Sequence, residues 1–222
     1  RQMCIRDRYN GDINNIKIDV GTTNMVIKYG DTFSITAENV SKEFKIKEEG
    51  NTLIIKEKNI TIFGNKKSSH TTITIPSSLN NLSIDIGAGK LELSDITSNN
   101  FSLNQGAGKV VITNLISNNT TIDGGAGELH ITSSKLQNLD LDLGAGKCYY
   151  NGILLGNNKI DQGVGELILD LQNDDYKFKV EKGLGSITVN GNSYSEDFEV
   201  GEGTNIIDID GGVGSIIINT NK

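Results

Sequence analysis

Proline, tryptophan and arginine are almost missing from this chain. Of its 222 residues one is proline, none is tryptophan, and all three arginines lie in the first eight positions. The single proline excludes a proline-rich linker, and no low-complexity stretch interrupts the sequence. No run approaches the ~18 consecutive apolar residues of a membrane-spanning helix.

The residues that usually carry chemistry are scarce as well. Histidine and cysteine occur twice each, in separate segments. This scarcity argues against a disulfide framework, a metal centre and a Cys/His nucleophile. The formal net charge of −7 argues against a nucleic-acid partner, because phosphate binding needs a basic surface.

Residues 1–8 differ in composition from the rest, because arginine occurs nowhere else. We therefore predict that 1–8 is a leader foreign to the domain; an ordinary basic tail is the alternative. The native N-terminus, with any signal or membrane anchor, would then lie upstream. The predicted organisation is this leader, an N-terminal β cap with a degenerate rung over 9–81, and a regular β-solenoid over 82–222 with an inserted loop around 191–203.

A Gly-x-Gly step recurs with a fixed period and is the strongest signal in the sequence. Its first glycines lie 19 residues apart over five repeats, and the next two intervals are 20 and 29 residues. A fixed period of this length indicates a repeat array, whose units bury their apolar faces by stacking on one another. The first glycines are Gly87, Gly106, Gly125, Gly144, Gly163, Gly183 and Gly212.

Apolar and polar residues alternate on both sides of each step, which is typical of β-strands. Relative to the first glycine, the third residue before it and the first, fourth and sixth after it are apolar in nearly every repeat. Stacked at the ~4.8 Å strand spacing, these columns predict an all-β, parallel β-solenoid with rungs of about 19 residues. We expect a right-handed coil, by analogy with parallel crossovers. The residue between the glycines is expected to point inward: Ala88, Ala107, Ala126, Ala145, Val164, Leu184 and Val213.

The first third of the chain is related but irregular. Ile16–Gly21 matches the strand before a step, but Thr22-Thr23-Asn24 replaces the step itself. The turn Glu49-Gly50-Asn51 predicts a hairpin within a cap that covers an open strand edge. In the regular repeats, pairs such as Asn99-Asn100 predict bends where side-chain amides bond along a ladder.

One polar column, two residues before each step, is almost entirely acidic. Neighbouring carboxylates about 5 Å apart would repel by up to ~3 kcal/mol at an effective dielectric constant of ~20. Two interpretations are open: corner N–H groups and nearby lysines stabilise the carboxylates, or the column binds Ca²⁺ weakly. No other cofactor is predicted. The acidic members are Asp85, Asp123, Asp142, Asp161, Glu181 and Asp210.

A second outward column, five residues after the first glycine, leans apolar. Such a strip is either a binding face or plain β-propensity on a solvated sheet. The residues proposed for the binding face are Val111, His130, Tyr149, Ile168 and Ile217.

Motifs for nucleotide binding and catalysis fail on spacing. Gly-Ala-Gly-Lys lacks the upstream glycine and the following Ser or Thr of a P-loop. No Gly-x-Ser-x-Gly elbow occurs. The remaining enzymatic alternative is a β-helix that cleaves polysaccharides with paired carboxylates. The regular spacing of the carboxylates and the missing arginines argue against it.

The Ile-Asp-Ile-Gly-Ala-Gly-Lys-Leu-type repeats, the Ile-Asp-Val-Gly rung and the terminal Gly-Val-Gly-Ser-Ile-Ile-Ile resemble the bacterial β-strand-repeat putative-adhesin family, a domain of unknown function. They are more distantly similar to adhesin-head β-helix domains. The resemblance covers residues 9–222. It implies an extracytoplasmic location in the envelope, behind an upstream anchor, and it supplies no catalytic residues.

The sequence thus predicts a non-enzymatic envelope or surface β-solenoid that acts in adhesion, binding or envelope sensing through its flat faces. Its partner would be an unidentified protein or polysaccharide, and it would meet a membrane only through the missing anchor. The alternatives are a carbohydrate-active enzyme or polysaccharide-binding module, and a self-assembling structural scaffold.

Overall fold

The computed structural model describes residues 3–8, 12–57, 69–76 and 78–221. Within these ranges the secondary structure consists of strands and turns, and all strands belong to one 15-stranded sheet. No helix in the described residues is long and apolar enough to cross a membrane.

The strands follow one another along the whole chain. They are β1 (Met3–Arg8), β2 (Asn15–Tyr29), β3 (Ser34–Val40), β4 (Lys45–Glu49), β5 (Thr52–Glu57), β6 (His70–Ile75), β7 (Leu79–Gln137), β8 (Leu139–Leu155), β9 (Asn157–Leu171), β10 (Tyr176–Glu181), β11 (Leu184–Val189), β12 (Asn192–Tyr194), β13 (Phe198–Val200), β14 (Asn205–Asp210) and β15 (Val213–Thr220).

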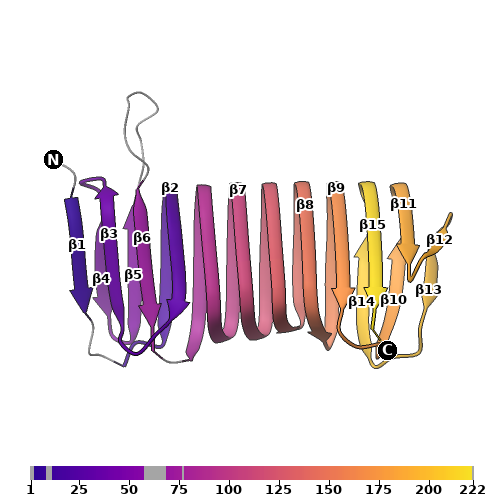
Figure 1. Cartoon of the computed structure of the whole chain (residues 1–222), viewed down its shortest axis with the longest axis horizontal. Helices are drawn as coiled ribbons and strands as arrows, with labels where there is room; N and C mark the ends of the chain where they lie inside the picture. Colours follow the sequence, from indigo (N-terminus) through magenta and orange to yellow (C-terminus); the bar gives the residue numbers. More distant parts are fainter. Residues whose placement is uncertain (1–2, 9–11, 58–68, 77, 222) are drawn as a thin grey trace.

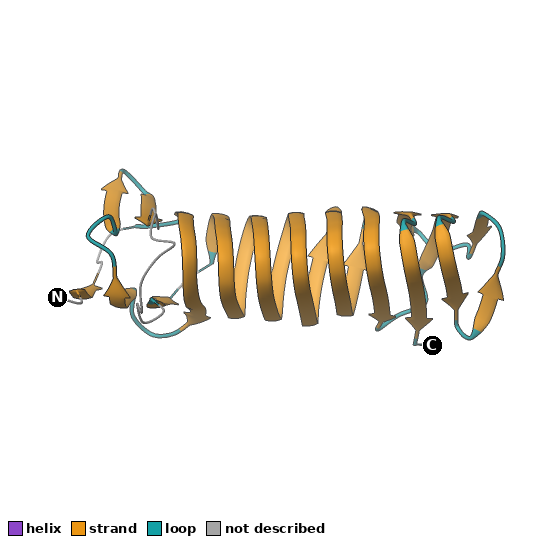
Figure 2. Cartoon of the chain, turned by 90° about the horizontal axis from the view of Figure 1, so that it is seen from above, coloured by secondary structure: helices purple, strands orange, loops and turns teal. Residues whose placement is uncertain are grey.

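In the middle of the molecule the chain winds as a coil of parallel rungs (Figures 1 and 2). Thr120 of β7 pairs with Leu139 of β8, and Asp140 of β8 pairs with Lys159 of β9, so successive rungs are offset by one repeat. The 59-residue β7 alone passes through several turns of the coil. The predicted parallel, all-β architecture is confirmed, while the hand of the coil stays a prediction.

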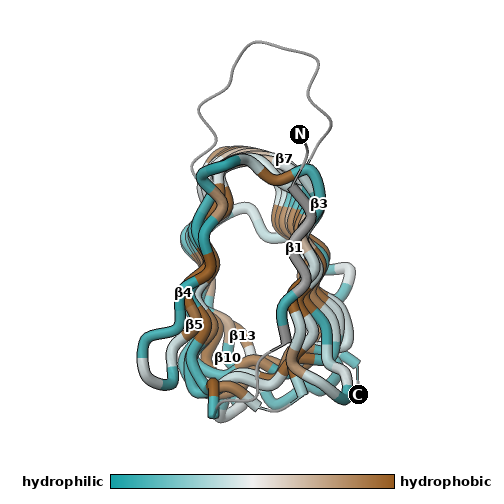
Figure 3. The backbone as a smooth tube through the Cα atoms, turned by 90° about the vertical axis from the view of Figure 1, so that its left-hand side faces the viewer, coloured by the Kyte–Doolittle hydropathy of each residue, from teal (hydrophilic) through white to brown (hydrophobic). Residues whose placement is uncertain are grey.

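Two long walls enclose the core, as the view along the coil in Figure 3 shows. We call the strand segments before each glycine step wall A and those after it wall B. The steps that join the walls form the glycine edge, along the top of Figure 1. Wall B ends at a second bend, where Asp95, Asn114 and Ser133 have φ values of 58°, 55° and 53°. A short third side then leads back to wall A.

Three of the four apolar columns face the core as predicted. In one rung, Leu141, Cys148 and Tyr150 are each at most 2% exposed. Along the sheet these columns form a single hydrophobic cluster that runs from Ile13 to Ile218.

The prediction that the residue between the glycines points inward is wrong. Val164, Val213 and Leu184 are 58%, 47% and 76% exposed, and the alanines of this column are exposed or half-buried. The glycines leave no room for a side chain, since a Cβ on Gly146 would lie 1.9 Å from the Gly127 oxygen of the neighbouring rung. The residue between the glycines therefore lies on the convex, outer side.

At the N-terminal end the rungs stack out of sequence order. β2 lies directly against the first regular rung, and β5 and β6 lie on its other side. β3 and β4 then add antiparallel strands, and β1 pairs antiparallel with β3. The predicted hairpin through Glu49 and Thr52 is confirmed, but the degenerate rung is internal, and the cap lies outside it. Whether 1–8 is a foreign leader stays a prediction.

The C-terminal end repeats this arrangement. The last rung in sequence, β14 and β15, pairs with β9 on one side and with β10 and β11 on the other. The 191–203 insertion supplies β12 and β13, which pair antiparallel with β11 and β10. Antiparallel strands thus cover the outermost parallel strands at both ends, which limits open edges that would recruit other chains.

Asparagine side chains form the predicted ladder at the bend opposite the glycine edge. Asn81 donates to Asn15 at 2.6 Å, Asn100 to Asn81 at 2.8 Å, and Asn119 to Asn100 at 3.0 Å. Each amide both donates and accepts, so the ladder ties rungs together without net charge.

Candidate binding faces

The outward apolar column of wall B forms one row on the surface. His130 pairs with Tyr149, Tyr149 with Ile168, and Ile168 with Ile217. With Val111 in the preceding rung, these side chains are all half-buried. The structure therefore brings together the five residues of the predicted binding face, and we call them the wall B row.

Ion pairs border this row on the side nearer the glycine edge. Lys109 contacts Glu128 at 2.9 Å, and Glu128 lies 3.5 Å from His130. In the next rungs Lys147 contacts Glu166 at 3.5 Å. The hydrogen bond and charge of Lys109 hold the pKa of Glu128 below its ordinary value. These pairs balance one another, so this border of the row carries little net charge.

Polar side chains border the row on its other side. Asn219 donates to Asp170 at 2.7 Å, and Thr113 and Thr132 lie 3.4 Å apart. Hydrogen bonding to the Asp170 carboxylate, aided by partial burial, raises the pKa of the Tyr149 hydroxyl. Tyr149 is therefore neutral at physiological pH, and it presents an aromatic ring beside a carboxylate and amides.

The acidic column also aligns, on the outer surface of wall A. Asp123, Asp142, Asp161, Asp210 and Glu181 follow one another in register. At the far end of the column, Asp85 pairs with Asp19 of β2, and Asn104 fills the rung between Asp85 and Asp123. We call this set the acidic row.

Lysine contacts the acidic row. Lys159 donates to Asp161 at 2.8 Å, and the pKa of Lys159 is raised, chiefly by that hydrogen bond. Among the described residues, no three acidic, histidine or cysteine side chains are grouped to hold a metal ion. Calcium binding stays a prediction.

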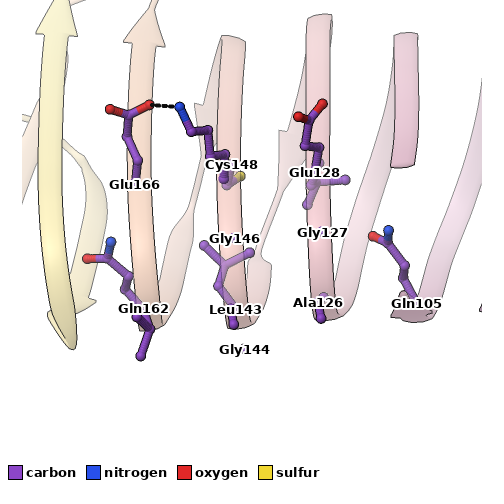
Figure 4. A pocket seen from close by; sticks show the side chains of 15 residues that line it. Gln105, Ala126, Gly127, Glu128, Leu143, Gly144, Gly146, Cys148, Gln162 and Glu166 are labelled. Atoms are coloured by element: carbon purple, nitrogen blue, oxygen red, sulfur yellow. Dashed lines mark ion pairs between the residues drawn. The ribbon is translucent and has the colours of Figure 1, made fainter. Parts of the chain in front are cut away.

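A small hollow of about 20 Å³ lies at the glycine edge between walls A and B (Figure 4). Gln105, Gln162 and Cys148 line it from inside the coil. Gln162 donates to the Gly165 oxygen at 3.1 Å. Gln105 is only 4% exposed. Burial raises the pKa of the Cys148 thiol to about 12.

The apolar columns of the sequence did not reveal this hollow. The residue just before the first glycine points inward, and this position alternates between apolar, amide and glycine residues. Ile86 fills the space in one rung, Gln105 partly fills it in the next, and Gly124 leaves it empty. The irregular column was the signal that could have revealed it.

Comparisons with known proteins agree with this architecture. A crystal structure described as a "putative adhesin" from Bacteroides fragilis NCTC 9343 matches with a TM-score of 0.66 and 18% sequence identity, covering 98% of this chain and 97% of that chain. At that identity the likeness shows the fold alone. A "putative cell adhesion protein" from Clostridium sporogenes ATCC 15579 has 18% identity and a TM-score of 0.38, with 100% of each chain covered. No curated protein matches the sequence.

The family assignment rests on the sequence. Residues 13–205 match the family model described as Toastrack DUF4097. That range spans most of the chain, from before β2 to the start of β14, and includes every regular rung up to β9. The resemblance predicted from the repeats is confirmed, and the chain belongs to the Toastrack DUF4097 family.

Proposed function

We propose that this chain is a non-enzymatic binding protein of the cell envelope or surface, and that it contacts its partner through the wall B row. The observation that carries the proposal is the row itself: five apolar or aromatic side chains, half-buried and in register over consecutive rungs. Tyrosine and large aliphatic residues on a rigid face are typical anchors of binding surfaces.

The borders of the row favour an uncharged partner surface. The lysines on one side are already paired with glutamates, and the opposite border is mainly amide and hydroxyl. An aromatic ring flanked by a carboxylate and amides suits a polysaccharide, whose rings stack and whose hydroxyls exchange hydrogen bonds. A protein surface of similar polarity is the other candidate.

The lysines beside the candidate carboxylates argue against the interpretation as a carbohydrate-active enzyme. Glycosidic cleavage needs a carboxylic acid whose pKa is raised so that it can protonate the leaving group. The carboxylates lining the hollow at the glycine edge are Glu128 and Glu166. The pKa of Glu128 is lowered by Lys109, and Glu166 is paired with Lys147. The lowered pKa of Glu128 does not suit a general acid.

An extracytoplasmic location is part of the proposal. It is supported by the resemblance to adhesin families and by the fold shared with the Bacteroides protein described as a "putative adhesin".

Binding of the full chain to immobilised surface polysaccharides and peptidoglycan sacculi tests the proposal. The variant Tyr149→Ser/Ile168→Ser removes the centre of the wall B row. The matched control is Ile116→Ser, because Ile116 is 43% exposed on the third side of the rung, away from the row. We expect wild type and the control to bind alike and the row variant to bind at least about tenfold more weakly.

Three results would overturn the proposal. Equal binding by wild type and the row variant would remove the row from the interaction. Release of reducing sugar ends would identify an enzyme. Growth into filaments without any ligand, measured by light scattering, would favour the structural scaffold.

A further inference from the structure

We propose that the C-terminal half of the glycine edge binds a basic amphipathic helix of a partner protein. The surface combines two exposed rows that run side by side along the coil. It is separate from the wall B row, so the inference goes beyond the proposed function.

The first row is apolar and consists of the residues between the glycines. Val164 pairs with Val213, and Val213 with Leu184, so the three largest members occupy three consecutive rungs. They are 58%, 47% and 76% exposed, and they are three of the five large hydrophobic side chains exposed on the described surface. The row continues toward the N-terminal end through Ala145 and Ala126. A contiguous exposed patch of this kind marks an interaction site more often than isolated residues do.

The second row is the acidic row, three residues before the first row in each rung. In the same three rungs it contains Asp161, Asp210 and Glu181, and of these Asp161 is bonded to Lys159. On the wall B side of the edge, the corresponding residues of these rungs are Glu166, Ser215 and Ser186, and Glu166 contacts Lys147 of the neighbouring rung. Lys182, next to Glu181, is the nearest basic residue in the sequence.

A small hollow lies beside part of the first row. It lies between rungs of the edge and is lined by Ala126, Ala145 and Val164 of the apolar row (Figure 4). Inside it lies Gln105, which is 4% exposed. At about 20 Å³ the hollow has room for about one water molecule, so the two exposed rows carry the inference.

The charge of the acidic row and the spacing of the rungs indicate which kind of partner fits this surface. Carboxylates beside an apolar ridge attract a partner with cations beside an apolar stripe, and they repel anionic lipids and a second copy of this acidic chain. A helix repeats its face about every 5.4 Å, close to the rung spacing of about 4.8 Å. An extended strand repeats its face about every 6.6 Å and loses register sooner. A helix lying along the coil can therefore keep both stripes aligned over several rungs.

A designed 18-residue helix of leucine and lysine, with one leucine face, is a direct probe. Its binding to the full chain would be measured by calorimetry, next to a peptide of identical composition whose order breaks the leucine face. We expect the intact helix to bind at least about tenfold more tightly than the scrambled one. We also expect binding to weaken as NaCl rises from about 0.1 to about 1 M, because the screening length falls from about 10 to about 3 Å.

Two surface variants test the rows separately, and each has a matched control. Val164→Ser/Val213→Ser/Leu184→Ser removes the ridge, with Tyr29→Ser/Ile116→Ser as the control for exposed apolar residues elsewhere. Asp123→Asn/Asp142→Asn/Asp161→Asn/Asp210→Asn neutralises the acidic row. Its control is Glu43→Gln/Glu48→Gln/Glu196→Gln/Glu202→Gln, which removes the same charge from exposed sites elsewhere.

Both row variants should lose at least about tenfold in affinity for the helix, while both controls keep wild-type affinity. The Tyr149→Ser/Ile168→Ser variant should bind the helix normally, which separates this inference from the proposed function. The inference is overturned if the controls lose as much as the row variants, if the scrambled peptide binds equally well, or if sedimentation shows that Leu184 instead joins two copies of the chain.

Discussion

Asn219 donates a hydrogen bond to Asp170 at 2.7 Å although 49 residues separate them in the sequence. The contact exists because the last rung of the chain, β14 and β15, enters the stack beside β9. The segment that precedes it in sequence, β10 and β11, is pushed to the outer position. The C-terminal residues are therefore internal parts of the solenoid and not a tail.

This position predicts a large penalty for mutating the end of the chain. Ile218 is fully buried between β9 and β11. Ile218→Ala should lower the free energy of unfolding by about 2–5 kcal/mol, because it leaves a cavity in a packed core. Urea unfolding measures this, and Asn221→Ala, at an exposed position, should cost almost nothing. If Ile218→Ala lowered the free energy of unfolding as little as Asn221→Ala does, the position of β15 between β9 and β11 would be contradicted.

The glycine step should be intolerant of any side chain. Gly146 has φ 143°, and a Cβ there would lie 1.9 Å from a backbone oxygen of the neighbouring rung. Gly146→Ala should destabilise the protein by roughly 2–5 kcal/mol, through backbone strain and forced separation of the rungs. Gly50→Ala provides the comparison, because Gly50 also has positive φ, 61°, but open space around it. Its cost should be only about 1–2 kcal/mol. If Gly146→Ala and Gly50→Ala destabilised the protein equally, the positive φ, and not the contact with the neighbouring rung, would explain why glycine is required.

The asparagine ladder should contribute measurably to stability. Asn100 accepts from Asn119 at 3.0 Å and donates to Asn81 at 2.8 Å. Asn100→Ala should cost about 1–2 kcal/mol, since these two bonds and a longer one to the Asn80 oxygen, at 3.5 Å, are lost. Asn99 takes part in a single side-chain bond, from Asn118, so Asn99→Ala should cost about half as much. The ratio of the two values, from denaturant titration, is the test; a ratio near one would argue against the ladder.

Neighbouring carboxylates of the acidic row should repel one another. Asp142→Asn removes the charge between Asp123 and Asp161 and should raise the melting temperature by about 1–3 °C at low salt, with no gain at about 1 M NaCl. Asp31→Asn, at an exposed site outside the row, serves as the control. Adding CaCl₂ settles the calcium prediction: stabilisation of wild type that is lost in Asp142→Asn would establish a cation site.

The buried thiol predicts a pH dependence at the alkaline end. The folded pKa of Cys148, about 12, lies above the ordinary value of 9.0, so the folded protein holds this proton more tightly than the unfolded chain. The contribution of this group to stability is constant below pH 9 and falls as the pH rises from 9 toward 12. In a Cys4→Ser background, thiol reagents should not label the folded protein at pH 8, and Cys148→Ala should flatten the alkaline loss of stability. Rapid labelling of the folded state would show that the hollow admits reagents to this thiol.

The alternation of apolar and polar residues allowed much of the architecture to be predicted from the sequence. The inward columns of walls A and B, the hairpin at Glu49 and the asparagine ladder follow from residue period and turn chemistry, which act over a few residues. The alignment of the wall B row and of the acidic row follows from the same period, because stacking rungs of equal length places equivalent residues side by side. The candidate faces were therefore visible in the sequence.

The glycine edge was not predictable in the same way. A period-2 pattern carried through the bend places the alanine column inside, but the positive φ of glycines such as Gly146 turns the chain so that this column lies outside. The hollow beside Gln105 likewise depends on which neighbour fills the space. The large side chains that define the proposed ridge became a surface only in three dimensions.

The sequence by itself determined the repeat length, the strand pattern, the inward columns and the surface rows, because each depends on residues close together in the chain. The tertiary structure decided the order of the rungs at both ends and the outward direction of Val164, Val213 and Leu184. Rungs of equal length and similar pattern can stack on one another in any order. Their order is therefore fixed by which edges the antiparallel strands β1, β3, β4, β12 and β13 cover, and that choice depends on contacts between distant segments.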